Sequence, residues 1–138
     1  MEGCLVRAFL DASVLINLLK SDTQTEGKVG QLEKSFSFYT SSINVYEVFK
    51  GFYMHEKHLE IFSSKFDILL RNITVLPFDS ECAKKAAEIY SALRKKGKPI
   101  GEPDYMIAGC ALSNGVNTII TGNKKHFEHI KGLKVIVC

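Results

Sequence analysis

The chain has 138 residues, of which 46% are hydrophobic and 24% charged, a balance that is typical of one globular domain and excludes a disordered or low-complexity protein. Its net charge of +3 is too small to require a polyanionic partner. No apolar run reaches the roughly 20 residues of a membrane-spanning helix, and the four cysteines lack the spacing of a zinc site. We therefore expect one soluble, cytoplasmic domain over residues 1–138 with no membrane partner.

Short apolar runs alternate along the chain with longer segments in which apolar residues recur every three or four positions. The short runs, rich in β-branched residues, predict buried strands at 7–10, 36–40, 74–78, 118–121 and 134–137. The longer segments predict helices at 12–20, 28–34, 43–54, 57–71, 81–96, 103–113 and 125–130. Helices between strands imply a parallel sheet. We expect an α/β fold, a three-layer α/β/α sandwich around a five-stranded parallel sheet.

Ligands of such sheets bind outside the carboxyl ends of the strands. Asp11 directly follows the first predicted strand, so its carboxylate lies at this edge. An aspartate between a strand and a helix is also a favourable helix cap. Position alone therefore leaves both roles open for Asp11.

Glu47 stands in the segment SSINVYEVFKG, among apolar residues that occupy most of a predicted helix. A buried carboxylate without a partner is costly, so Glu47 must pair with another group or reach water. Its helix begins just after the second strand, which places Glu47 about one turn from the same sheet edge. An exposed stripe with the neighbouring Lys50 is the alternative.

Two further segments carry polar residues to helix starts or strand ends. In GKPIGEPDYMIAGCAL, Asp104 lies in the first turn of a helix opened by Pro103, and Glu102 is a peripheral candidate. In IITGNKKHF, Thr121 and Asn123 follow the fourth strand. Helix-dipole stabilisation explains an isolated Asp104, and a simple turn explains an isolated Asn123.

Four polar residues therefore fall at positions that face one edge of the predicted sheet: Asp11, Glu47, Asp104 and Asn123. Capping explains them separately but not jointly. Clustered carboxylates repel one another, and a divalent cation relieves that repulsion. Oxygen donors without Cys or His favour Mg2+ or Mn2+ over zinc, and such an ion suits hydrolysis of a phosphodiester.

Basic residues gather where the helix at 81–96 ends, and a further lysine follows the fourth strand: Lys95, Lys96, Lys98 and Lys124. They are either a solvated surface or a rim that contacts RNA phosphates. The aromatic-rich segment at 46–66 predicts a helix–helix interface. His126 and His129 lie close enough to Asn123 to approach the pocket, but we expect them at the surface.

The chain resembles the PIN-domain ribonucleases, and most closely the VapC toxins of VapBC toxin–antitoxin pairs. The resemblance covers nearly the whole chain and rests on four segments in order: FLDASVLINLL, SSINVYEVFKG, GKPIGEPDYMIAGCAL and IITGNKKHFEHIKGLKVI. It implies a Mg2+- or Mn2+-dependent endoribonuclease that cleaves single-stranded RNA. Its implied partners are a single-stranded or structured RNA substrate, a VapB-like antitoxin and a second copy of the chain.

The resemblance also implies roles for single residues. Asp11 and Asp104 match the main metal-binding aspartates, and Glu47 matches the helix-borne acid, so that these three are the expected catalytic and metal-binding residues. Ser13 and Thr121 match supporting hydroxyls. Asn123 stands where family members often carry a fourth acid, which puts a second metal ion in doubt.

Two other functional classes stay open. One is a PIN-domain RNA-processing nuclease outside any toxin–antitoxin pair. The other is a catalytically weak domain that binds RNA or a protein partner, a reading that Asn123 makes more credible and the three acids oppose. A phosphatase with a strand-end nucleophile is disfavoured because Asp11 is followed by Ala12 and Ser13 rather than by a D-x-D pattern.

Overall fold

The computed structural model describes residues 5–55 and 57–138. Its strands are β1 (Val6–Leu10), β2 (Phe36–Ser41), β3 (Thr74–Leu76), β4 (Thr118–Thr121) and β5 (Lys134–Val137). They form one sheet in the order β3-β2-β1-β4-β5, and every neighbouring pair is parallel. The chain leaves β1 toward β2 on one side and later returns to β4 on the other. The strand order therefore reverses beside β1, which is where open parallel sheets bind ligands.

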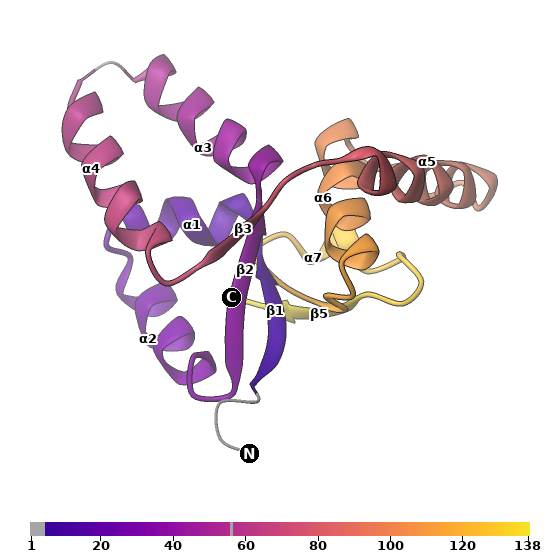
Figure 1. Cartoon of the computed structure of the whole chain (residues 1–138), viewed down its shortest axis with the longest axis horizontal. Coiled ribbons are helices and arrows are strands. Elements are labelled where there is room, and N and C mark those ends of the chain that lie inside the picture. The colour runs from indigo at the N-terminus through magenta and orange to yellow at the C-terminus, as the bar shows by residue number, and fades with distance from the viewer. Residues whose placement is uncertain (1–4, 56) are drawn as a thin grey trace.

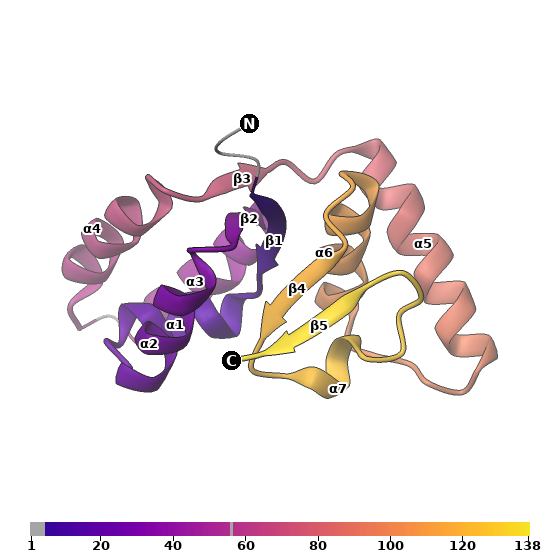
Figure 2. The ribbon, with the colours of Figure 1, turned by 90° about the horizontal axis from the view of Figure 1, so that it is seen from below.

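The helices cover both faces of this sheet, as Figure 1 shows. On one face lie α1 (Ala12–Leu19), α2 (Thr23–Leu32), α3 (Ser42–Met54) and α4 (Leu59–Leu70). On the other lie α5 (Ser80–Lys95), α6 (Glu102–Ser113) and the short α7 (Lys124–Phe127), and Figure 2 shows the same separation from below. The expected three-layer sandwich around five parallel strands is confirmed. No helix in the described part of the chain is long and apolar enough to cross a membrane.

The pleat of β1 divides the core between the two faces. Ala8 and Leu10 pack with α1, α3 and α4, whereas Phe9 between them packs with α5, α6 and α7. All three residues are fully buried, and burial of a side chain as large as Leu or Phe contributes about 1.5–3 kcal/mol. The central strand is thereby fixed from both sides, and its carboxyl end becomes a rigid support for Asp11.

Three predicted boundaries were wrong for identifiable reasons. The helix expected at 28–34 begins earlier, because the Asp22 carboxylate accepts hydrogen bonds from the Thr25 N–H and hydroxyl at 3.0 and 2.6 Å and caps α2. The third strand ends at Leu76 rather than at residue 78, since Pro77 has no N–H to donate to a neighbouring strand. The last helix is one turn, Lys124–Phe127, instead of 125–130.

Candidate active site

Asp11 lies buried at the carboxyl end of β1, with only 4% of its surface exposed. Its backbone N–H donates to the Ile120 carbonyl at 3.0 Å, which joins β1 to β4. One carboxylate oxygen, Oδ2, accepts hydrogen bonds from Thr121 Oγ1 at 2.8 Å and Ser13 Oγ at 3.1 Å. The carboxylate makes no capping hydrogen bond to α1. The helix-cap alternative for this side chain is therefore wrong, and Ser13 and Thr121 do lie against Asp11.

A buried amide that we did not single out in the sequence also approaches Asp11. Asn44 in α3 is fully buried, and its Oδ1 accepts a hydrogen bond from Ser41 Oγ at 2.5 Å. This bond turns the Asn44 amide nitrogen toward Asp11 Oδ1, 3.5 Å away. Asn44 precedes Glu47 by three positions and so shares its helix face, which is the sequence signal that would have indicated it.

Glu47 and Asp104 reach the same region from α3 and α6. Burial raises the pKa of Glu47, the negative charges of Asp11 and Asp104 raise it further, and Lys50 and His126 oppose the rise. Burial raises the pKa of Asp104 to about 6, His126 opposes this rise, and Asp11 adds to it. The negative charge of Asp11 therefore acts on both Glu47 and Asp104.

His126 is the second residue whose position the sequence did not predict. Its imidazole is half-exposed, which agrees with the surface position expected from the sequence. Its Nδ1 nevertheless lies 3.1 Å from Asp104 Oδ2. His129 instead lies near its neighbour Glu128, at 3.9 Å. Of the two histidines that follow β4, His126 therefore belongs to the pocket.

The structure does not bring every candidate into contact with the acids. Asn123 is exposed at the start of α7, and its backbone N–H, rather than its side chain, donates to Thr121 Oγ1 at 2.9 Å. Glu102 is exposed at the first position of α6. The four candidate lysines are also exposed, at the end of α5, in the following loop and at the start of α7: Lys95, Lys96, Lys98 and Lys124.

Comparison with known proteins identifies the family. The sequence model of the PIN-domain family matches residues 8–133. The chain is a PIN domain. It is 28% identical over 133 residues to the tRNA(fMet)-specific endonuclease VapC of Shigella flexneri, covering 94% of this chain and 96% of that protein. It is 32% identical over 133 residues to ribonuclease VapC1 of Methanocaldococcus jannaschii, covering 94% and 86%.

Its fold agrees with that of solved VapC proteins. The crystal structure of VapBC2 from Rickettsia felis bound to a promoter DNA fragment superimposes with a TM-score of 0.84 and 26% identity, over 96% of this chain and 99% of that chain. This PIN domain is thus of the VapC type, as the four sequence segments predicted.

The donor atoms of the PIN-domain pocket suit a hard divalent cation that keeps part of its water shell. Within residues 5–55 and 57–138, no three acidic, His or Cys side chains converge closely enough to form a complete metal cage. Mg2+ does not need one, because it dehydrates reluctantly and is usually bound through one or two carboxylates and several waters. Asp11 and Asp104 offer carboxylate oxygens of this kind, and a cation would offset the charge of Asp11, which adds to the rise that burial causes in the pKa of Asp104.

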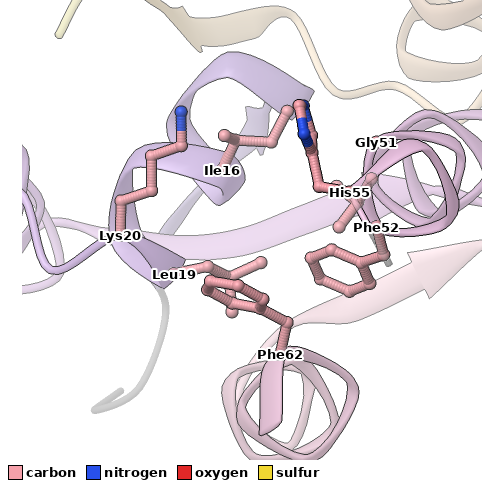
Figure 3. A pocket seen from close by; sticks show the side chains of 8 residues that line it. Ile16, Leu19, Lys20, Gly51, Phe52, His55 and Phe62 are labelled. Carbon is pink, nitrogen blue, oxygen red and sulfur yellow. The ribbon is translucent and has the colours of Figure 1, made fainter. Parts of the chain in front are cut away.

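A cavity of the PIN domain lies between α1, α3 and α4 (Figure 3). Its volume is ≈ 460 Å³. The apolar side chains of Leu19, Phe52 and Phe62 converge in it, and the nitrogen-bearing ends of Lys20 and His55 point to one side. We call this cavity the α1–α3–α4 groove.

The aromatic segment that led us to expect a helix–helix interface packs largely against itself. Phe52 stacks on Phe62 with ring centroids 5.6 Å apart and meets Phe66 edge-on at 6.1 Å. Much of this aromatic surface thus joins α3 to α4 within the chain. Tyr53, Met54 and Ile61 stay 63%, 78% and 59% exposed.

Proposed function

We propose that this VapC-type PIN domain is an endoribonuclease that uses Mg2+ or Mn2+ to hydrolyse phosphodiester bonds in single-stranded RNA, as the toxin of a VapBC-type pair. The observation that carries the proposal is the buried Asp11 carboxylate at the end of β1, where the strand order reverses, because its charge raises the pKa of both Glu47 on α3 and Asp104 on α6. The names of the relatives, ribonuclease and endonuclease, support the same chemistry.

In the mechanism we infer, Asp11 and Asp104 hold the cation, directly or through its waters. A bound divalent cation would lower the pKa of a water ligand and offset charge on the phosphate. Ser13, Thr121 and Asn44 fix the Asp11 carboxylate, so that it need not reorganise when a substrate binds. Glu47 forms no side-chain hydrogen bond in the described part of the chain, and its raised pKa suits a group that accepts a proton from the attacking water.

The exposed lysines at the end of α5 and the start of α7 would supply affinity for the RNA backbone. Phosphate contacts position a nucleic acid without reading its sequence. Lys95, Lys96, Lys98 and Lys124 are suited to this task because their side chains are exposed.

Cleavage of a single-stranded RNA oligonucleotide by the purified chain tests the proposed reaction. We expect cleavage with Mn2+ or Mg2+, none after chelation, and a loss of at least about 100-fold in the Asp11→Asn variant, because an amide is a poor ligand for a hard cation. Thermal unfolding of the variant should show a folded domain. Cleavage that persists in Asp11→Asn or in the presence of EDTA would refute the mechanism.

The antitoxin partner would occupy the α1–α3–α4 groove. An amphipathic helix inserts apolar side chains into grooves of this kind, and Lys20 and His55 at its rim favour acidic residues on that helix. A Cβ built at Gly51 meets no atom within 4 Å, and Gly51 lines the groove, so Gly51→Leu would project a side chain into the groove from a position where the Cβ itself causes no clash. We expect it to weaken binding of a VapB-like protein at least about tenfold, whereas Gly27→Leu on α2, which is equally open, should not.

We also propose that the chain forms a homodimer through the exposed apolar residues around the α3–α4 connection, Tyr53, Met54 and Ile61. Exposed apolar patches of this kind usually mark interaction surfaces. Sedimentation equilibrium should give the mass of a dimer for the parent chain and of a monomer for Ile61→Glu. A monomeric parent chain would exclude this interface.

An RNA-processing nuclease outside a toxin–antitoxin pair would share the same pocket. The two functions differ in their biological context. A toxin should arrest growth when expressed alone and be silenced by a small protein with a DNA-binding N-terminus encoded next to it. Expression without growth arrest, and no such neighbouring reading frame, would favour the processing enzyme.

A further inference from the structure

The three acids of the pocket differ in how their carboxylates are held. Asp11 accepts hydrogen bonds from the side chains of Ser13 and Thr121 and is approached by the Asn44 amide. Asp104, whose side chain is only 14% exposed, has no such hydrogen bonds in the described part of the chain and instead faces the imidazole of His126, whose Nδ1 lies 3.1 Å from its Oδ2. The orientation of the Asp104 carboxylate therefore depends on one contact.

The backbone around α7 fixes His126 beside this carboxylate. The next residue, Phe127, is fully buried in the core, and the His126 N–H donates to the Asn123 carbonyl at 3.0 Å. Asn123 in turn donates its backbone N–H to Thr121 Oγ1, the hydroxyl that also bonds Asp11. These hydrogen bonds connect the backbone of His126 to Thr121 and through it to Asp11.

We propose that His126 is a positioning residue for Asp104. Its Nδ1 faces Oδ2 at 3.1 Å, holds the carboxylate on that side and leaves Oδ1 for the cation, so the inference rests on the cation site proposed above. The negative carboxylate favours a proton on Nδ1, which the charged ring carries and which the neutral ring carries in one of its two tautomers. Partners of this kind orient metal-binding carboxylates, and their loss typically costs 10–100-fold in metal affinity.

The test is Mn2+ affinity, measured by calorimetry on the parent chain and four variants. His126→Ala removes the donor. His126→Asn keeps an amide N–H close to the place of Nδ1, whereas His126→Gln carries its amide one bond farther out. His129→Ala is the matched control, because the His129 side chain is 47% exposed and that of His126 is 50% exposed, and His129 lies two residues beyond α7.

We expect His126→Ala to bind Mn2+ about 10–100-fold more weakly, His126→Gln to be similarly impaired, and His126→Asn to recover most of the affinity. His129→Ala should bind like the parent chain. Thermal unfolding of the metal-free variants identifies any that fail to fold. Recovery by Asn but not by Gln separates a donor at Nδ1 from a general structural role.

Three results would overturn the inference. If the parent chain binds Mn2+ and His126→Ala binds it equally well, His126 does not position Asp104, although the cation site stands. If spin-echo spectra of bound Mn2+ show a directly coordinated imidazole nitrogen that disappears in His126→Ala, the residue is a ligand instead. If the parent chain binds no Mn2+, the proposed function fails, and the inference fails with it.

Discussion

Asp104 is the acid of the pocket whose charged form the folded chain disfavours most. Burial raises its pKa from 3.8 to about 6, and the charge of Asp11 contributes to that rise. The folded chain therefore retains the Asp104 proton at pH values where the unfolded chain has lost it. Stability consequently falls as the pH rises from about 4 to 6. At neutral pH the metal-free domain then carries a charged carboxylate whose burial is only partly offset by His126.

We predict that Asp104→Asn stabilises the metal-free chain at about pH 7.5 while impairing metal binding. The gain in the free energy of unfolding should be about 1–3 kcal/mol, because one unit of pKa shift corresponds to about 1.4 kcal/mol, and it should shrink toward zero at about pH 4. Urea denaturation with EDTA at the two pH values measures this gain. Asp67→Asn, a change at an exposed position on α4, is the control. A variant less stable than the parent chain at neutral pH would contradict the prediction.

The strands and most helices were predictable because each is encoded locally. Strands 118–121 and 134–137 were predicted at their observed bounds. Short runs rich in β-branched residues between turn residues are typical of buried strands. The start of α2 was predicted too late, because TQTEGKVGQL contains two glycines and few apolar residues and so shows a weak helical pattern. The capping residue Asp22 indicated the start of this helix better than the apolar pattern did. The groove between α1, α3 and α4 depends on packing over long sequence distances and was not predictable.

Gly109 in α6 marks the closest approach of two helices. A Cβ at this position would lie 2.6 Å from the Ala86 nitrogen and 2.8 Å from the Ala86 Cα, both atoms of the α5 backbone. We predict that Gly109→Ala lowers the free energy of unfolding by about 1–3 kcal/mol, since α5 must move away. Gly27→Ala in α2, where a Cβ meets nothing within 4 Å, should instead stabilise the chain by about 0.5–1 kcal/mol. Equal effects of the two changes on chemical denaturation would show that α5 and α6 are not so closely packed.

Across the whole molecule, the pocket could be predicted only in part. The sequence singled out Asp11 because it follows a strand end, Asp104 because it lies in the first turn of a helix, and Glu47 because its helix begins just after β2, at the shared edge of a parallel sheet. His126 contacts Asp104, 22 residues away along the chain, and Asn44 contacts Asp11, 33 residues away. Of the two, only Asn44 carried a sequence signal, its place on the helix face of Glu47. Asn123 is exposed, whereas the side chain of His126 in α7 lies against Asp104.

Charge is also distributed unevenly over the molecule, with exposed lysines where α5 ends. We predict that replacing Lys95, Lys96 and Lys98 together by Gln weakens binding to single-stranded RNA and lowers the slope of log affinity against log salt by up to about 2, at about 0.7 per phosphate contact. Anisotropy titrations in the Asp11→Asn background, between about 50 and 200 mM salt, measure this slope. Lys84→Gln with Lys85→Gln is the control, because those lysines bond Glu81 and Glu88 on the same helix. If the control pair lowers the slope as much, the RNA phosphates do not specifically contact the lysines at the end of α5.

The central claim, that the Asp11 and Asp104 carboxylates share one cation, is tested most directly by anomalous scattering from crystals soaked in Mn2+. We predict one strong Mn2+ peak at the carboxyl edge of β1 and β4, in direct or water-mediated contact with the Asp11 and Asp104 carboxylates, and no such peak in Asp11→Asn crystals. The absence of a peak at this edge, or a peak that persists in Asp11→Asn, would contradict the claim.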